Sequence, residues 1–154
     1  MNANNTNRFG TGLPSFVTYK IARVQNRLNA QATAILRKHT DLSLTEWRII
    51  SIVNLLKSTT ASTISREVGM DKGQISRAVK PLIDRGLLEP CEHEKDSRQT
   101  ILCLTNRGQE VVDEHSKIMR ARQDSLTQNI EDDELDVFYR VLEKLYKNAE
   151  VPSR

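Results

Sequence analysis

Two short helical segments joined by a glycine-containing turn, followed by two strand-like segments around a charged tip, occupy residues 60–108. Helix-turn-helix units are built in this way, and a hairpin directly after the second helix makes the unit a winged helix. Long apolar stripes at helical spacing flank this stretch on both sides. These observations predict a mainly α fold with a small β-hairpin wing, in which the N- and C-terminal helices form a helical dimerisation region.

The length of 154 residues fits one domain with a core of its own. Apolar periodicity and turn signals divide the chain into four parts. The expected parts are a flexible N-terminus at residues 1–12, the dimerisation region at 13–41 and 106–149, the winged helix-turn-helix at 42–105, and a tail at 150–154.

Bulk composition excludes several classes of protein. Hydrophobic residues make up 38% of the chain and charged residues 28%, so neither disorder nor a membrane protein is indicated. No apolar run approaches the roughly 20 residues that a membrane-spanning helix needs, and the polar start lacks the apolar centre of a secretory signal. The two cysteines fit a reducing compartment better than a disulfide scaffold, so a cytoplasmic protein is expected.

The net charge of +3 is unevenly distributed along the chain. Residues 1–59 carry a net charge of +6, residues 60–108 carry +1 and residues 109–154 carry −4. Because the winged-helix stretch is nearly neutral, net charge supports nucleic-acid binding only weakly. Nucleic-acid binding must therefore be judged from where individual side chains are placed.

The first long helix is expected to begin near Pro14, which suits a first helical turn, and to end near Lys38. Its apolar residues recur in steps of three and four, and the same spacing returns near the C-terminus. A domain this small cannot cover so long a stripe, so we expect part of it to meet a second subunit. The predicted dimer-interface residues are Val17 and Ile21 in the first helix and Leu135, Phe138, Leu142 and Leu145 in the last.

The second helix is predicted to begin at a capping box formed by Ser43 and Glu46. It is apolar nearly all round, which is typical of the buried centre of a domain. Trp47, the only tryptophan, lies in its first turn. Core packing is the expected role of this side chain, and the wall of a ligand cleft is the alternative.

Two shorter helices are expected next, after a break at Ser58–Thr60. Thr60 can cap the third helix, Gly69 supplies the turn, and Asp71 can cap the fourth helix. The expected buried face of the fourth helix consists of Ile75, Val79 and Leu82.

The opposite face of the fourth helix carries side chains suited to reading DNA. Glutamine can pair with adenine and arginine with guanine, serine can donate or accept, and a glycine lets the backbone come close. No acidic residue lies on this face between Asp71 and Asp84, whereas a merely solvated helix would more often pair Glu with Lys. The predicted DNA-binding residues are Lys72, Gly73, Gln74, Ser76, Arg77 and Lys80.

Gly86 is expected to end the fourth helix, and residues 87–94 and 99–104 to form the hairpin. A basic hairpin tip beside a groove-reading helix can reach the neighbouring minor groove. An ordinary polar turn is the alternative. The predicted DNA-binding residues of the tip are Lys95, Ser97 and Arg98, with Asp96 orienting Arg98.

Thr105 is expected to cap a fifth helix that runs to about Ile130. The acidic residues from Glu131 to Glu134 lie where the start of a sixth helix favours anions. The residues of the fifth helix expected to face inward are Val111, His115, Ile118 and Leu126.

Cys91 and Cys103 lie on opposite strands of the predicted hairpin and could approach each other. We expect structural or incidental thiols, and an oxidant-sensing pair is the alternative. With His93 they could be drawn as metal ligands, but a fourth ligand and a CxxC pair are missing, so no metal site is predicted.

These segments together resemble the MarR family of bacterial transcription regulators, over about residues 13–146. The matching pieces are LSLTEWRII, MDKGQISRAVKPLIDRGLLE and DSRQTILCLTNRG, in this order. The last piece fits the family's Asp-x-Arg followed by Leu-Thr-x-x-Gly, through Asp96, Arg98, Leu104, Thr105 and Gly108. The chain departs from many members at Ser97, where they carry a second arginine, and at Pro90, where they carry a basic residue.

The resemblance implies an obligate homodimer whose two winged helices bind a pseudo-palindromic double-stranded DNA operator. It further implies repression that a small ligand relieves, commonly an aromatic carboxylate or an acyl-CoA thioester, while some members sense oxidants through cysteine. Arg98 matches the family's minor-groove arginine. For a ligand cleft between the dimerisation region and the winged helix, the candidate residues are Tyr19, Arg23, Trp47 and His115.

An enzyme is not indicated, because the sequence contains no Gly-rich phosphate loop, nucleophile motif or HExxH-type metal site. No cofactor is expected. The predicted function is that of a sequence-specific DNA-binding repressor released by a small ligand. The alternatives are a cysteine-based oxidant-responsive regulator and a winged helix used for protein contacts rather than specific DNA.

Overall fold

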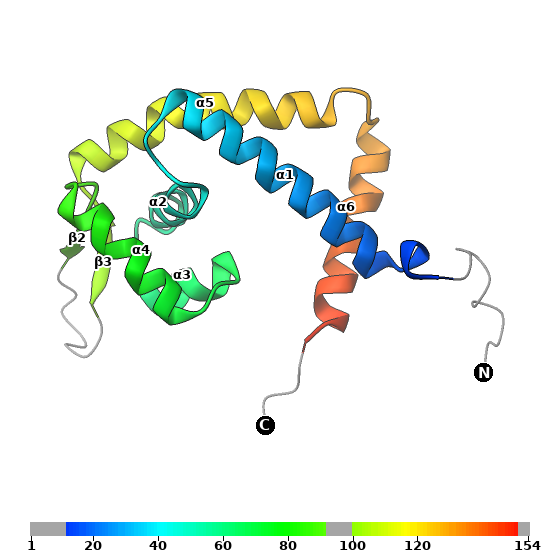
Figure 1. The fold of residues 1–154 in the computed structure, drawn as a ribbon, viewed down its shortest axis with the longest axis horizontal. Helices are drawn as coiled ribbons and strands as arrows, with labels where there is room; N and C mark the ends of the chain where they lie inside the picture. The colour runs from blue at the N-terminus through cyan, green and yellow to red at the C-terminus, as the bar shows by residue number, and fades with distance from the viewer. Residues whose placement is uncertain (1–11, 92–99, 151–154) are drawn as a thin grey trace. The chain divides into compact units, whose positions relative to one another are not determined.

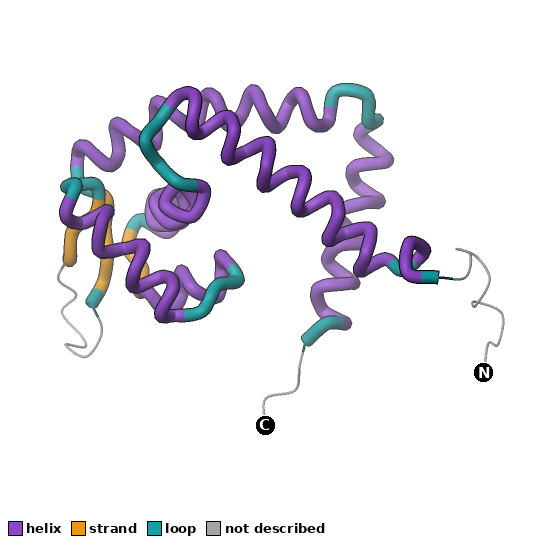
Figure 2. Tube along the Cα trace, viewed as in Figure 1, coloured by secondary structure: helices purple, strands orange, loops and turns teal. Residues whose placement is uncertain are grey.

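The computed structural model describes residues 12–91 and 100–150. The chain divides into two compact units, Met1–Ser116 and Lys117–Arg154, which are described separately. Figures 1 and 2 show a mainly helical chain with one small sheet, as predicted. The elements in order are the 3₁₀-helix η1 (Leu13–Ser15), α1 (Val17–His39), α2 (Leu44–Leu56), β1 (Ser58–Thr60), α3 (Ala61–Val68), α4 (Lys72–Asp84), β2 (Leu88–Cys91), β3 (Ile101–Leu104), α5 (Asn106–Thr127) and α6 (Asp132–Asn148).

Local capping chemistry sets the starts of the three central helices as predicted. The Ser43 side chain accepts a hydrogen bond from the Glu46 N–H, and the Ser43 N–H donates to the Glu46 carboxylate. The Thr60 hydroxyl accepts from the backbone N–H of Thr63 at the start of α3. The Asp71 carboxylate accepts from the Gln74 N–H at the start of α4. Each cap satisfies an N–H that the helix itself leaves unpaired.

The core of the first unit forms around α2, which contacts α1, α3, α4, β1 and β3. Ile49, Ile50 and Val53 of α2 are completely buried, as are Ile64 of α3 and Ile75 of α4. Burying a side chain of this size contributes about 1.5–3 kcal/mol. The apolar face of α2 therefore holds the two shorter helices.

The expectation that α2 is buried all round is wrong at its C-terminal end. Leu55 is 76% exposed and Leu56 is 42% exposed. The chain reverses at Lys57, which has a positive φ of 64°, and enters β1. This reversal leaves the last turn of α2 at the surface.

The sheet contains a strand that the sequence did not reveal. Ser58–Thr60 was expected to be only a break but forms β1, which pairs antiparallel with β3 in the order β1-β3-β2. Thr59 lies opposite Leu102, and both residues are buried. A three-residue polar strand has too little pattern to be recognised locally, because its pairing partner lies more than 40 residues away.

A tight junction joins the end of α4 to the start of α5. Gly86 has a φ of 66° and ends α4, and the Leu87 N–H donates back to the Leu82 carbonyl. The Thr105 hydroxyl donates to the Gly86 carbonyl and accepts from the Gly108 N–H. A Cβ at Gly108 would lie 2.1 Å from the Leu87 carbonyl oxygen, so only glycine fits there. The Leu-Thr-x-x-Gly pattern is thus explained by backbone packing.

The long helix α5 faces inward through a slightly different set of residues than predicted. Val112 and His115 are buried, whereas Val111, Ile118 and Leu126 are only partly covered. The helix ends at Thr127, a few residues before the expected end. The predicted acidic start of α6 is confirmed as a capping box between Glu131 and Glu134.

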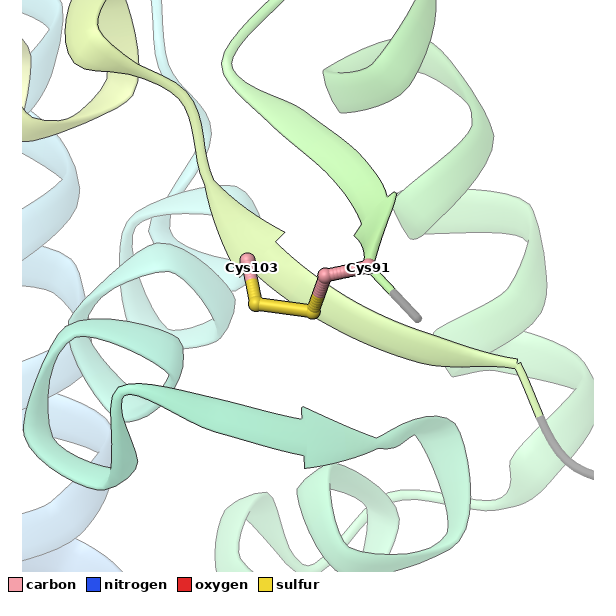
Figure 3. Close-up of a disulfide and its surroundings, with 2 residues drawn as sticks. All are labelled: Cys91 and Cys103. Atoms are coloured by element: carbon pink, nitrogen blue, oxygen red, sulfur yellow. A yellow bond between two sulfur atoms is a disulfide. The ribbon is translucent and has the colours of Figure 1, made fainter. Parts of the chain in front are cut away.

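The two cysteines form a disulfide, so the expectation of free thiols is wrong (Figure 3). In the antiparallel ladder Cys91 lies opposite Ile101, so Cys103 is its diagonal neighbour. The Cα atoms of the two cysteines are 5.9 Å apart, which is within the range that a disulfide requires. The predicted proximity of the two residues across the hairpin is confirmed.

Candidate nucleic-acid interface

The interface is built on α4, whose apolar face is anchored in the core. Ile75 and Leu82 are fully buried and Val79 is 7% exposed. These three positions follow the 3.6-residue period, so the remaining positions of α4 turn outward. Anchoring through three side chains fixes the rotation of α4 about its own axis.

The outward face of α4 carries every residue that the sequence predicts there. All six residues predicted for DNA binding on this helix are exposed to solvent. We call this set the α4 reading face; it consists of Lys72, Gly73, Gln74, Ser76, Arg77 and Lys80. The face therefore combines two amide- or hydroxyl-bearing side chains with three cations and has no acidic group.

A groove runs beside the reading face, between α4, the start of α3 and β3. Ser76 and Lys80 of α4 line it, together with Ser62 of α3 and Leu102 of β3. Its volume is about 650 Å³. The groove thus lies between part of the reading face and β3.

An ion-pair cluster that the sequence did not predict fixes the C-terminal end of α4. One guanidinium nitrogen of Arg85 lies 2.6 Å from an Asp41 carboxylate oxygen, and another lies 3.2 Å from Glu46. The second carboxylate oxygen of Glu46 is the one that accepts from the Ser43 N–H. Arg85 therefore ties the end of α4 to the start of α2 through the capping box of α2.

The predicted residues of the wing tip, Lys95, Asp96, Ser97 and Arg98, lie outside the described residues, as does His93. The base of the wing is described and is formed by β2 and β3, paired from Leu88–Leu104 to Cys91–Ile101. The order of the elements brings this base directly after α4. The predicted roles of the tip residues remain predictions.

The four candidate ligand-binding residues occur as two pairs in the first unit. The Arg23 guanidinium lies 5.9 Å from the centre of the Tyr19 ring, both on α1. The Trp47 and His115 rings lie 6.2 Å apart, between α2 and α5. A cavity of about 350 Å³ beside Trp47 is lined by residues of α1, α2 and α3, but Tyr19, Arg23 and His115 are not among its lining residues.

Buried polar atoms without a partner gather near Trp47. Nδ1 of His115 lies 2.7 Å from the Val111 carbonyl oxygen and donates to it, so Nε2 is the free ring nitrogen. This Nε2 atom is buried, and it has no hydrogen-bond partner in the described part of the chain. The hydroxyl of Ser51, which lines the cavity beside Trp47, is also unpartnered. Unsatisfied buried groups of this kind point to a missing partner.

The predicted dimer-interface residues are largely uncovered in the single chain. Val17 is 48% exposed, Ile21 39% and Phe138 52%, and no residue of α6 is buried. Leu135, Leu142 and Leu145 are partly covered. Further exposed apolar residues continue these two surfaces, namely Leu13, Phe16 and Val24 near the start of α1 and Val137, Tyr139, Val141 and Tyr146 on α6.

Residues 12–91 and 100–150 contain neither a metal-binding cluster nor a membrane-spanning helix. Within these ranges no group of three His, Cys, Asp or Glu residues is placed to hold a metal ion. Within the same ranges no helix has the length and apolar character needed to cross a membrane.

Known proteins similar to this chain are transcription regulators. Residues 40–99 match the sequence model of the MarR family. The structure is similar to that of a MarR/EmrR family transcriptional regulator from Acinetobacter sp. ADP1, with a TM-score of 0.83 and 28% identity over 90% of this chain and 97% of that one. The chain therefore resembles the MarR family in sequence over residues 40–99 and in fold over most of its length.

Two further proteins are similar to the chain, one in sequence and one in fold. The HTH-type transcriptional regulator BilQ of Clostridium symbiosum is 29% identical over 87 residues, which are 56% of this chain and 60% of that protein. The fold is also similar to that of Streptococcus pneumoniae FabT, solved in complex with DNA, with a TM-score of 0.69 and 22% identity over 85% of this chain and 93% of that one. The chain thus shares its fold with a protein that has been solved in complex with DNA.

Replacing Arg85 by alanine is predicted to lower the free energy of unfolding by about 1–2 kcal/mol, because two charge-assisted hydrogen bonds are lost at a half-buried site. Urea unfolding at fixed protein concentration measures this change. Arg66→Ala is the matched control, since its pair with Glu67 is 3.5 Å long and both side chains are largely exposed. That control should change stability by about 0.5 kcal/mol or less. Equal losses in the two variants would contradict the assigned role of Arg85.

Proposed function

We propose that this chain is a MarR-family, sequence-specific DNA-binding repressor that acts as a homodimer and is released by a small ligand. The observation that carries the proposal is the α4 reading face. Its six members are exposed on a helix whose other side is locked into the core through Ile75, Val79 and Leu82. A rigidly presented polar helix following a tight turn is the element that helix-turn-helix proteins insert into the major groove.

The chemistry of the reading face favours base readout over phosphate binding alone. Arg77 can donate two hydrogen bonds to a guanine, and Gln74 can both donate to and accept from an adenine. Lys72 and Lys80 are suited to the phosphates on either side. Phosphate binding by itself would require only cations, so Gln74 and Ser76 support sequence-specific recognition.

The wing is proposed to add a minor-groove contact beside the major-groove contact of α4. The sequence places Lys95, Ser97 and Arg98 between the two strands of the wing, and Asp96 is suited to orient Arg98. An arginine gains most from a narrow, A·T-rich minor groove, where the negative potential is strongest. The operator is therefore proposed to contain A·T-rich flanks.

The homodimer is supported by the uncovered apolar surfaces of α1 and α6. Val17, Ile21 and Phe138 expose large parts of their side chains to water in the single chain. Large apolar side chains exposed on each of these helices favour an interaction site. A symmetric dimer would present two α4 helices to a pseudo-palindromic site with half-sites about one helical turn apart.

The proposed effector is an aromatic acid or its CoA thioester, bound near Trp47. The cavity beside Trp47 includes the Arg48 side chain, which can attract a carboxylate, and the unpartnered hydroxyl of Ser51. Gln25 of α1 also lines this cavity, so a ligand here would contact both α1 and α2. In the dimer the two α4 helices can lie at different distances from each other. A ligand that binds more tightly when this distance does not match the operator would then release DNA.

Arg77→Ala is predicted to weaken binding to the selected operator by about 1–3 kcal/mol and to relax preference at one base position. Selection from a random duplex library, followed by anisotropy titration at fixed salt, measures both effects. Arg37→Ala removes the same charge from the exposed last turn of α1 and should leave base preference unchanged. If no duplex is enriched by the wild-type chain, the winged helix serves contacts other than specific DNA.

Charged substitutions on the apolar surfaces are predicted to dissociate the homodimer. Phe138→Glu would bury a carboxylate in the proposed interface without a partner, and its mass by light scattering should fall to that of one chain. Operator affinity should fall with it, because only one half-site is then bound. Leu55→Glu, at a position 76% exposed on α2, is the control and should keep the wild-type mass. A dimeric Phe138→Glu variant would exclude Phe138 from the interface.

Because Trp47 is the only tryptophan, effector binding can be followed by its fluorescence. A screen of aromatic carboxylates and their CoA thioesters is predicted to yield a compound that raises the melting temperature, alters the Trp47 emission and weakens DNA binding. Trp47→Phe should keep the DNA response to that compound but remove the emission change. A compound that releases DNA while leaving Trp47 emission unchanged would locate the effector site elsewhere.

A further inference from the structure

The cavity beside Trp47 presents two opposite charges that do not neutralise each other. Arg48 of α2 and Glu67 of α3 both line this cavity. In the part of the chain that the structure describes, no ion pair joins these two side chains. The cavity therefore offers one cationic group and one anionic group to a bound molecule.

The cation, Arg48, is held in place by a neutral partner. Its guanidinium donates to the side-chain carbonyl oxygen of Asn29 on α1 over 2.7 Å. This hydrogen bond restricts the side chain but leaves its charge without a carboxylate partner among residues 12–91 and 100–150. A half-buried guanidinium of this kind is suited to a ligand carboxylate, which accepts charge-assisted hydrogen bonds from it.

The anion, Glu67, is held only weakly. Its carboxylate lies 3.5 Å from a guanidinium nitrogen of the neighbouring Arg66, and both side chains are largely exposed. Exposed ion pairs of this kind contribute little to stability, so a ligand can replace Arg66 at small cost. An ammonium group, which is charged and carries three N–H donors, is suited to this carboxylate.

The other walls of the cavity combine apolar surface with two uncharged polar groups. Trp47 and Ile52 of α2 and Val68 of α3 supply an aromatic ring and aliphatic surface. Gln25 of α1 adds an amide, and Ser51 adds a hydroxyl without a hydrogen-bond partner in the described part of the chain. The volume of about 350 Å³ lies near the lower end of the roughly 300–1,000 Å³ of ligand pockets, so a small ligand fits.

We propose that this cavity binds a free aromatic amino acid in its zwitterionic form. The carboxylate of the ligand pairs with Arg48, its ammonium group pairs with Glu67, and its ring packs on Trp47. The inference rests on the proposed effector site and narrows the ligand from aromatic acids in general to those that also carry an ammonium group. An acid without an amine leaves Glu67 without a ligand partner, and an amine without a carboxylate leaves Arg48 without one.

The test measures binding to the full chain by isothermal titration calorimetry in the absence of DNA. The ligands are the free amino acids L-phenylalanine, L-tyrosine and L-tryptophan, and at least one is expected to bind at one site per chain. Each is compared with its two truncated forms, which for phenylalanine are 3-phenylpropanoate and 2-phenylethylamine. The truncated forms should bind at least about fivefold more weakly, because each lacks one charge-assisted hydrogen-bonding group.

Charge-removing variants connect each group of the ligand to its residue. Glu67→Gln should weaken binding of the amino acid but not of the acid that lacks the amine. Arg48→Gln should weaken binding of the amino acid and of that acid, but not of the amine, and Arg48→Lys should bind the amino acid more tightly than Arg48→Gln. Glu110→Gln and Arg37→Gln, at exposed positions outside the cavity, are the matched controls and should bind like the wild type. A melting curve verifies that each variant is folded.

The outcomes separate this inference from the proposed function. The inference is overturned if no aromatic amino acid binds with a Kd below about 1 mM, if the truncated forms bind equally well, or if Glu67→Gln binds like its control. An aromatic acid without an amine that binds beside Trp47 and releases DNA would then leave the proposed function standing. Binding with the expected variant pattern, but without an effect on affinity for a selected duplex, supports the inference and overturns the role of this cavity as the effector site.

Discussion

The junction at Gly86 and Leu87 is the constraint on which the rest of the winged helix depends. Three elements meet there: the end of α4, the start of the wing and the first turn of α5. The Leu87 N–H closes the end of α4 on Leu82, and the Leu87 carbonyl accepts from the Thr105 N–H over 3.2 Å. The absence of a side chain at Gly108 lets α5 begin against the same carbonyl. A change at this junction therefore moves the reading helix, the wing and α5 together.

Locally determined features of the structure were predictable from the sequence. The caps at Ser43, Thr60 and Asp71 depend on side chains three residues from the groups that they satisfy, so their pattern is visible in the sequence. The reading face of α4 follows from helical periodicity once its buried side is recognised. These features needed no knowledge of distant contacts.

Features that depend on distant partners were missed. Arg85 binds Asp41 and Glu46, which are 44 and 39 residues away, and nothing near Arg85 distinguishes it from an ordinary surface arginine. β1 is a strand only because β3 lies beside it. The disulfide required the register of β2 against β3, since a shift by one residue would have turned the two cysteines to opposite faces. Tertiary pairing, rather than propensity, decides each of these cases.

The winged-helix stretch is nearly neutral, so its affinity for DNA must depend on the placement of side chains more than on net charge. A strongly basic surface can bind DNA through many interchangeable phosphate contacts and tolerates imprecise placement. Here the net charge of residues 60–108 is only +1, so each contact must be well placed to count. The core anchors of α4, the Arg85 cluster and the Gly86–Leu87 junction all act on the placement of α4, and the Cys91–Cys103 bond acts at the base of the wing. Because binding would then be limited by positional freedom more than by attraction, the contacts that fix α4 matter more than further positive charge would.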